Sequence, residues 1–210
     1  MQLISATPSP YARKVRIALA EKGVPFELRT EVPWNDDTSL PRHNPLEKLP
    51  VLVLDDGTAV WESGHILDWI ERKFPHPPLL PPDDDGYLAH KRMDALATGM
   101  CDALVLVFFE RMRPEGQRSG AWTDRQLRKV HGGLAEIARV VGTRDYAVGD
   151  RFGLADIAAG SVLGYLEVRF RELDWRGAYP ELGRYMDGLM RRPSFRDTVP
   201  YPQVITGRVV

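Results

Sequence analysis

The chain has 210 residues, of which 43% are hydrophobic and 27% charged, and its 28 lysines and arginines balance 29 aspartates and glutamates. A formal net charge of −1 gives no overall field to attract nucleic acid or anionic lipid, and favours a small uncharged or zwitterionic ligand. Cys101 is the single cysteine, which excludes an internal disulfide or a cysteine metal cluster and fits a reducing compartment. No stretch reaches the ~18 apolar residues of a membrane span, and no basic segment precedes an apolar run at the start, so we expect a cytoplasmic protein without membrane association.

Strand and helix patterns alternate through residues 1–76. The patterns predict strands at 2–6 and 24–30, helices at 13–22 and 62–74, and a hairpin at 50–61. The hairpin turns at Asp56-Gly57, a dipeptide typical of tight turns. Two strands joined by one helix pair in parallel through a right-handed crossover. The first part of the chain is therefore predicted to be an α/β unit with a mixed four-stranded sheet. Along the chain its elements follow the order strand, helix, strand, strand, strand, helix.

The composition changes after this unit. Residues 77–86 are rich in proline and aspartate, which cannot continue a helix or a central strand, so we expect a linker there. Residues 87–210 carry helical periodicity. The predicted helices cover 87–113, 124–141, 154–170 and 180–191. The sequence thus predicts an α/β domain followed by an all-helical domain.

Ser9 stands between the first strand and the first helix, in the segment TPSPYARK. A serine at this place is suited to cap the helix, and Pro10 at the next position has no amide to satisfy. On local grounds alone Ser9 is a cap, and a chemical role remains the alternative.

Four segments of the chain resemble the cytosolic glutathione S-transferase superfamily. They are SPYARKVRIALAEKGVPFE at 9–27, NPLEKLPVLVLDDGTAVWES at 44–63, GDRFGLADIAAG at 149–160 and YPELGRYMDGLMRRPSF at 179–195. Their order and spacing match the family over essentially the whole chain. The resemblance implies a thioredoxin-like N-terminal domain, an all-α helical bundle as C-terminal domain, glutathione as co-substrate, no metal, and a homodimer.

The resemblance also implies a site for the glutathione backbone. It implies a cis bond between Leu49 and Pro50, which presents the backbone of Val51 to the cleft for pairing with an extended peptide. Independently of the resemblance, Pro50 is suited to be the first residue of a strand, because its missing amide hydrogen is not needed there for pairing with a neighbouring strand.

Charged groups are expected at both ends of the tripeptide. Ser63 and its amide, at the start of a helix, suit the γ-glutamyl carboxylate, and Glu62 suits the adjacent ammonium. The same two residues read locally as a helix cap and an acidic first-turn residue. His43 and Lys48 are the candidate cations for the glycyl carboxylate, with Arg42 also nearby, although isolated cations on polar loops are commonly only solvated.

A thiolate is the nucleophile that such a site must stabilise. Ser9 can donate a hydrogen bond to sulfur at the positive end of a helix, so the cap and the catalyst need not compete. The segment looks most like the theta-like, tau-like and related bacterial serine branches. Tyr11 is the second candidate, since other branches use a tyrosine, but it falls within the first helical turn. Cys101 is expected to be a small buried side chain, which makes thiol-transferase chemistry a poor fit.

A second substrate would lie between the domains, and its candidate residues are Tyr11, Phe108, Arg111 and Met112. An apolar floor with one cation suits a small electrophile with a polar tail. Phe108 and Phe109 are equally well explained as core or dimer contacts.

The helix that begins at GLADIAAG departs from the family at one position. Gly153 stands where the family has Ser or Thr, so the side-chain cap of that helix is absent and its stability is in question. Asp156, three residues later, has capping-box spacing and is expected to be structural.

The predicted function is therefore conjugation of the glutathione thiolate to a small, hydrophobic electrophile. Two alternatives remain: a glutathione-binding or protein-interaction module with little turnover, and a glutathione-dependent isomerase. The isomerase is the weaker of the two, because the serine-cysteine-rich signature of the maleylacetoacetate isomerase branch is missing.

Overall fold

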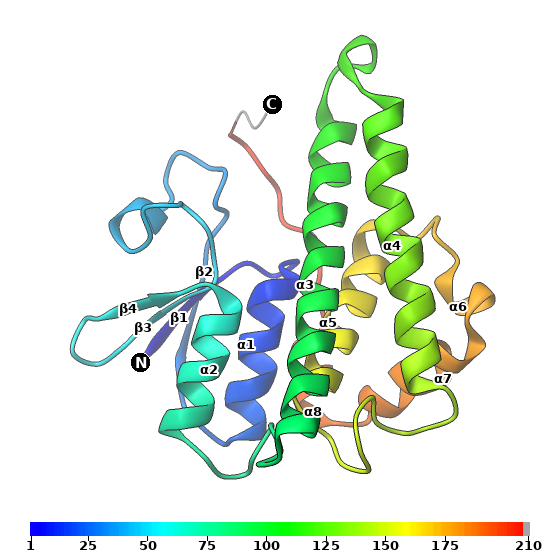
Figure 1. Cartoon of the computed structure of the whole chain (residues 1–210). Coiled ribbons are helices and arrows are strands. Elements are labelled where there is room, and N and C mark those ends of the chain that lie inside the picture. Colours follow the sequence, from blue (N-terminus) through cyan, green and yellow to red (C-terminus); the bar gives the residue numbers. More distant parts are fainter. Residues whose placement is uncertain (208–210) are drawn as a thin grey trace.

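The N-terminal domain is built on a four-stranded sheet in the order β2-β1-β3-β4, and the computed structural model describes residues 1–207 (Figure 1). Strand β1 pairs with β2 in parallel and with β3 antiparallel, and β3 pairs with β4 antiparallel. The predicted mixed sheet is confirmed. The elements of this domain are β1 (Gln2–Ser5), α1 (Pro10–Glu21), β2 (Glu27–Thr30), the 3-10 turn η1 (Leu40–Arg42), β3 (Val51–Val53), β4 (Ala59–Trp61) and α2 (Ser63–Lys73).

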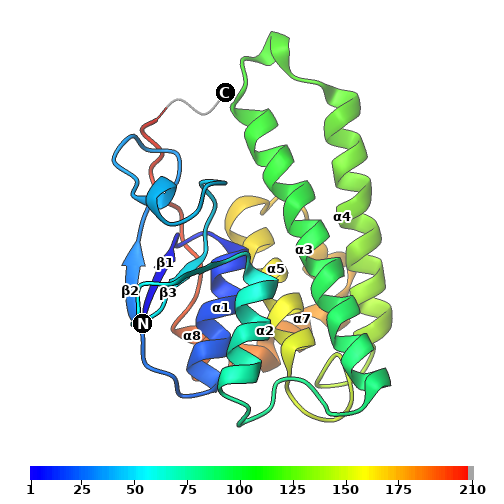
Figure 2. The same ribbon diagram turned by 60° about the vertical axis from the view of Figure 1, so that its left-hand side comes forward.

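The second domain is helical as far as Arg196, as predicted. Its elements are α3 (Asp84–Met112), the 3-10 turn η2 (Glu115–Gln117), α4 (Gly120–Val141), α5 (Leu154–Arg169), α6 (Trp175–Ala178), α7 (Pro180–Leu189) and α8 (Pro193–Arg196). Helices α3 and α4 form a long pair that extends beyond the other helices, as Figure 2 shows. Helix α5 is buried along residues 154–166 and packs on both α3 and α1, so it forms the centre of the core.

Several helices begin earlier than their apolar periodicity predicts. Helix α1 begins at residue 10, directly after the predicted cap Ser9 and ahead of the apolar stripe that begins at 13. Helix α3 begins at 84 instead of 87, and α4 at 120 instead of 124. Each begins directly after a residue whose side-chain oxygen accepts from an amide three positions on. These pairs are Ser9 with Ala12, Asp83 with Gly86 and Ser119 with Trp122. The polar first turn is outside the apolar stripe, so the cap and not the stripe sets where the helix starts.

The start of α5 explains the unusual Gly153. A Cβ at this position would lie 2.5 Å from His90 Cε1 and 2.7 Å from the carbonyl oxygen of Leu79. The imidazole of His90, from α3, takes the place of a capping side chain, because its Nδ1 accepts from the amide of Ala155 at 3.0 Å. The amide of Leu154 donates to the Leu79 carbonyl at 2.8 Å. The helix is therefore capped by residues distant in sequence, and glycine makes room for them.

Asp156 has the structural role that the sequence predicts. Its carboxylate is fully buried and accepts from the amides of Ala147 and Gly153 at 2.8 and 2.9 Å and from the hydroxyl of Tyr185 at 2.6 Å. Burial raises the pKa of the Asp156 carboxyl, although these hydrogen bonds oppose the rise. Asp156 thus ties the loop before α5 to α7.

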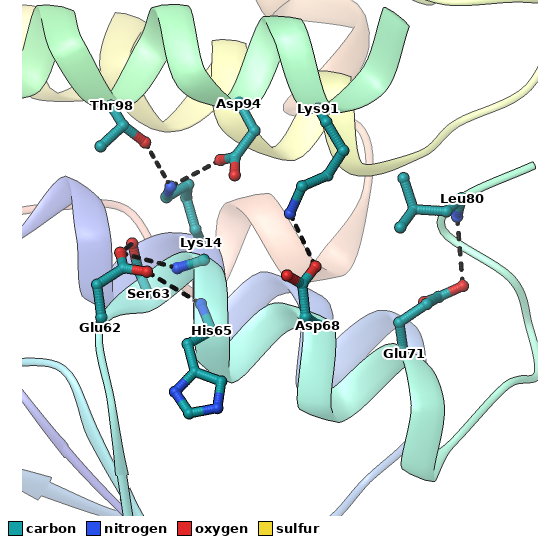
Figure 3. Close-up of polar contacts among 11 residues, drawn as sticks. Lys14, Glu62, Ser63, His65, Asp68, Glu71, Leu80, Lys91, Asp94 and Thr98 are labelled. Carbon is teal, nitrogen blue, oxygen red and sulfur yellow. Dashed lines mark hydrogen bonds and ion pairs between the residues drawn. The ribbon is translucent and has the colours of Figure 1, made fainter. Parts of the chain in front are cut away.

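One face of α3 contacts the N-terminal domain. Lys91 and Asp94 form ion pairs with Asp68 of α2 and Lys14 of α1, at 2.8 and 2.7 Å (Figure 3). Further along the helix, Asp102 accepts from the hydroxyl of Tyr11 at 2.5 Å. The contact residues recur every three or four positions because such positions lie on one side of a helix.

The described C-terminal segment, residues 199–207, returns to the N-terminal domain (Figure 1). The hydroxyl of Thr7 donates to the carbonyl of Tyr201 at 2.8 Å, and the amide of Thr7 donates to Oε1 of Gln203 at 3.1 Å. The sequence predicted an all-helical domain to the end of the chain, but residues 199–207 form no helix and bond the N-terminal domain instead.

Candidate functional site

Ser9 is the N-cap of α1 and lies half buried between β1 and α1. Its Oγ accepts from the amide of Ala12 at 3.2 Å, as the cap reading predicts. Since the oxygen serves as acceptor toward the helix, the hydroxyl hydrogen remains available for donation to a ligand. The positive end of the helix dipole lies at the same place. The local geometry therefore permits one residue to cap the helix and to stabilise a neighbouring anion.

Tyr11 has a different environment. Its hydroxyl donates to Oδ1 of Asp102 on α3 at 2.5 Å. Burial, together with the nearby Cys101 and Asp102, raises the pKa of the Tyr11 hydroxyl far above its usual value, so the group stays neutral. Its one proton is already engaged, whereas that of Ser9 is not.

The Leu49-Pro50 peptide bond is cis, which confirms the expectation from the resemblance. Pro50 is buried and directly precedes β3. Val51 is fully buried between Ile4 of β1 and Trp61 of β4, so both in-plane directions of its backbone face another strand. This register leaves no free backbone edge at Val51 for the peptide pairing that the resemblance implies. Leu49 is half buried and lies outside the paired segment.

The loop before Pro50 is held by Asn44, which the sequence analysis did not identify. Its Nδ2 donates to the carbonyl of Lys48 at 2.7 Å, and its Oδ1 accepts from the amide of Leu46 at 3.0 Å. His43 is half buried and the Lys48 side chain is exposed, one on each side of this buried asparagine. The signal was the Asn-Pro step, because asparagine side chains often bond the backbone two residues on.

Glu62 is the N-cap of α2, and its side-chain carboxylate caps the helix. Its two oxygens each accept at 3.0 Å from an amide, those of Gly64 and His65, and the Ser63 hydroxyl donates to Oε1 at 3.3 Å (Figure 3). Burial favours the neutral acid, but the amides and the cation of Lys14 outweigh it, and the pKa of the Glu62 carboxyl lies below its usual value. Glu62 is thus a fixed anion at the edge of the site.

The backbone at Glu62 is in a sparsely populated region, with φ 72°. For a residue with a side chain this conformation costs on the order of 1–3 kcal/mol and is concentrated at functional sites. Two of the first three amides of α2, those of Gly64 and His65, donate to Glu62. The third, the amide of Ser63, has no acceptor within residues 1–207 and can donate to a ligand. Ser63 is itself buried, so a ligand here would meet a preformed donor.

A buried ion pair lies beneath this helix start. Nζ of Lys14 contacts Asp94 at 2.7 Å and donates to Oγ1 of Thr98 at 2.9 Å, and the Lys14 side chain is 3% exposed (Figure 3). Lys14 belongs to α1 and its two partners to α3, one helical turn apart. No local pattern in the sequence indicates this group, because only the docking of the two domains brings the three residues together.

The second-substrate candidates are not all directed to one place. Phe108 is half buried, and its ring lies 4.5 Å from the guanidinium carbon of Arg169 on α5. Arg111 is paired with Glu172 at 2.6 Å, so its charge is already neutralised. Met112 is 41% exposed at the end of α3. The cation that the sequence analysis expected for the polar tail of an electrophile is therefore engaged elsewhere.

Cys101 is buried, as predicted, and burial raises the pKa of its thiol to about 12, so it stays protonated. Among residues 1–207 no group of three or more His, Cys, Asp or Glu side chains is arranged to hold a metal ion. In the same part of the chain, none of the helices has the length and apolar content required to cross a bilayer.

Comparison with known proteins identifies clear relatives. Family profiles described as "Glutathione S-transferase, N-terminal domain" and "Glutathione S-transferase, C-terminal domain" match residues 8–73 and 120–188. A glutathione S-transferase of Methylobacterium radiotolerans, crystallised in complex with glutathione sulfonate, is 66% identical with a TM-score of 0.98, covering 100% of this chain and 99% of that one. A glutathione S-transferase of Methylobacillus flagellatus with glutathione bound is 40% identical with a TM-score of 0.91 over 95% and 98% of the two chains. The uncharacterised GST-like protein YibF of Escherichia coli is 36% identical over 202 residues, 95% of this chain and 98% of its own length.

Proposed function

Because this chain belongs to the glutathione S-transferase family, we propose that it conjugates the thiolate of glutathione to a small hydrophobic electrophile, with Ser9 as the residue that stabilises sulfur. The observation that carries the proposal is the Ser9 hydroxyl, which lies at the N-terminus of α1 and uses its oxygen, not its hydrogen, to cap the helix. Tyr11 is the second choice, since its proton is engaged with Asp102.

The polar groups around Ser9 match the chemical groups of glutathione. The Ser63 amide suits the γ-glutamyl carboxylate, while the Ser63 hydroxyl is bonded to Glu62, whose fixed anion suits the ammonium beside that carboxylate. We assign pairing with the peptide backbone to Leu49, next to the cis bond, with Pro50 and Val51 holding the strand in place. His43 and Lys48, held on either side of Asn44, are assigned to the glycyl carboxylate.

In the proposed reaction the glutathione thiol loses its proton to solvent. The hydroxyl of Ser9 donates a hydrogen bond to the resulting thiolate, which lowers the energy of the charged sulfur. The sulfur then forms a bond to an electron-poor carbon of the second substrate as the bond to the leaving group breaks, and the leaving group departs with the bonding electrons. Ser9 is not a base here, because a neutral hydroxyl is far too weak to remove the proton.

The test is to measure glutathione binding and turnover separately. We expect calorimetry to show binding of glutathione and an assay with a chloronitroarene to show conjugation. Absence of binding would reject the assignment of the site. Binding without turnover of any electrophile would favour the alternative of a binding or interaction module, and isomerisation of maleylacetoacetate without conjugation would favour the isomerase.

We also propose that the protein is a cytoplasmic homodimer, with the N-terminal domain of one subunit against the helical domain of the other. The domain limits proposed from the sequence are 1–76, 77–86 and 87–210, although the first turn of α3 already begins at Asp84. Sedimentation of the purified protein should give twice the 23.7 kDa mass of one chain. A monomer at micromolar concentration would contradict the dimer without affecting the glutathione site.

A further inference from the structure

The turn that carries Ser9 has few amides with which to bond the rest of the molecule. Of residues 7–10, TPSP, the two prolines have no amide hydrogen. The amide of Ser9 donates to the carbonyl of Ala6 at 3.1 Å, which is a local bond. The amide of Thr7 is therefore the one amide of this turn that can join it to a distant part of the chain.

Both donors of Thr7 bond the C-terminal segment. Its amide donates to Oε1 of Gln203 at 3.1 Å, and its hydroxyl donates to the carbonyl of Tyr201 at 2.8 Å. Nε2 of Gln203 donates to the carbonyl of Glu31, just after β2, at 3.5 Å. A glutamine side chain has one end that accepts and one that donates, and both ends of Gln203 have partners. Thr7 is 7% exposed and Gln203 is half buried, so the bond between them is largely shielded from water.

The chain is held on the other side of Ser9 as well. Arg13, one helical turn later, donates its amide to the carbonyl of Ser9 at 3.0 Å. Its guanidinium is buried and donates to the carbonyl of Phe195 at 3.3 Å and to Oγ1 of Thr198 at 3.4 Å. The end of the chain therefore contacts α1 one turn after Ser9 and the turn two residues before it.

The segment that reaches Thr7 is also fixed beyond Gln203. Oδ1 of Asn35, in the loop after β2, accepts from the amide of Thr206 at 2.9 Å and from that of Gly207 at 3.4 Å. Gln203 therefore lies between two anchored stretches of the chain, and its side chain holds the turn against a fixed part of the N-terminal domain.

We propose that Gln203 and Thr7 are positioning residues for the Ser9 hydroxyl. The cap bond to Ala12 holds this hydroxyl relative to α1 alone. The groups assigned to the other parts of glutathione lie on the loop before β3 and at the start of α2, so the direction from the hydroxyl to sulfur also depends on where the turn lies relative to them. A hydrogen bond weakens steeply as its donor leaves the line to the acceptor. The inference rests on the proposed function, because it concerns the residue that stabilises sulfur there.

The test measures the pKa of the thiol of bound glutathione, from the ultraviolet absorbance of the thiolate at saturating glutathione as the pH is raised. We expect the intact protein to hold this pKa below that of free glutathione. Gln203→Met keeps the length of the side chain but removes both polar ends. It should raise the thiol pKa by about one unit, which is a tenfold loss of thiolate at a pH well below both values. Affinity for glutathione should change by less than threefold, because the groups that bind its other parts are untouched.

Matched variants separate the two bonds from the bulk of the segment. Thr7→Val removes the hydroxyl that bonds Tyr201 and should also raise the thiol pKa, whereas Thr7→Ser keeps the hydroxyl and should leave the pKa as in the intact protein. Val204→Met is the control for the segment, because Val204 follows Gln203 directly and is 78% exposed. It should leave the thiol pKa unchanged.

A double variant tests whether the effect passes through Ser9. If Gln203 acts by placing the Ser9 hydroxyl, adding Gln203→Met to Ser9→Ala should not change the thiol pKa further. A general loosening of the site would raise the pKa in both backgrounds, because the two substitutions would then act independently.

The outcomes separate the two proposals. If the intact protein lowers the thiol pKa and Gln203→Met leaves it unchanged, or raises it equally with and without Ser9, the positioning role is rejected and the proposed function stands. If the intact protein binds glutathione but leaves the thiol pKa at its value in solution, the roles of Ser9 and Gln203 are both rejected. If the intact protein does not bind glutathione, the proposed function falls, and the inference about Gln203 falls with it.

Discussion

Helices α1 and α5 begin in opposite ways. Helix α1 is capped by its own neighbour Ser9, whose oxygen accepts from Ala12, and this leaves the hydroxyl hydrogen for chemistry. Helix α5 begins after Gly153, which has no side chain, and His90 from α3 accepts from its second amide. The first start is a local arrangement that faces the site, while the second is assembled from distant residues in the core. Mutations at each position should therefore differ in what they damage.

The largest expected effect is on chemistry at the start of α1. Ser9→Ala should lower conjugation of a chloronitroarene by ~10² or more, the scale of losing one donor to a developing charge, about 2.7 kcal/mol. Affinity for glutathione should change by less than tenfold, because its other groups bind elsewhere. Steady-state kinetics and calorimetry on the same preparation measure both quantities. Turnover equal to that of the unmodified protein would transfer the role to Tyr11 or to backbone amides.

At the start of α5, a residue that is ordinarily preferred for capping should lower the stability of the protein. Gly153→Ser adds a side chain of the type preferred at an N-cap, which ordinarily stabilises a helix. Here its Cβ would fall against the Leu79 carbonyl and His90, so we expect the free energy of unfolding to drop by ~2 kcal/mol. Urea denaturation measures the drop. A rise in stability would show that the backbone relaxes and that the two helix starts are equivalent.

Removing the distant cap should cost somewhat less. His90→Ala leaves the buried amide of Ala155 without its acceptor, a loss of about 1–2 kcal/mol in unfolding free energy. His90→Asn is the matched control, because its side-chain oxygen can accept in place of Nδ1. Equal denaturation midpoints for the alanine variant and the unmodified protein would contradict the capping role of His90.

The smallest expected effect is on the pH dependence of the free energy of unfolding. Burial, with the nearby Arg151, holds the pKa of His90 below 6.5, although Asp83 and Glu71 oppose this. The folded protein therefore binds fewer protons than the unfolded chain in this range. Stability from His90 should be complete above pH 6.5 and decline as the pH falls below it toward the depressed value. His90→Asn should flatten this part of the curve, and an unchanged slope in that variant would assign the pH dependence to other groups.

Much of the site followed from local sequence. The cap at Ser9 and the carboxylate of Glu62 at the start of α2 lie within a few residues of the atoms that they organise. The cis bond at Pro50, in contrast, was expected only from the family resemblance, because an isolated X-Pro bond is usually trans. The role of Asp156 was likewise predicted from a spacing of three residues and is confirmed. For such positions the turn or helix geometry sets the distances, so the residue types are sufficient to predict the contact.

Other features depended on contacts between residues that are distant in the sequence, either within the helical domain or between the two domains. His90 reaches Ala155 across 65 positions, Thr206 reaches Asn35 across 171, and the charge of Arg111 is taken by Glu172. The sequence by itself determined the order of elements and the local helix caps, such as Ser9 on α1, because these depend on backbone geometry over one or two turns. The tertiary structure alone decided which face of α3 meets the N-terminal domain, and hence that Asp94 pairs with Lys14 and that Phe109 packs against Trp34. Contacts of that kind arise from packing, where the partner is chosen by three-dimensional proximity and carries no local signature.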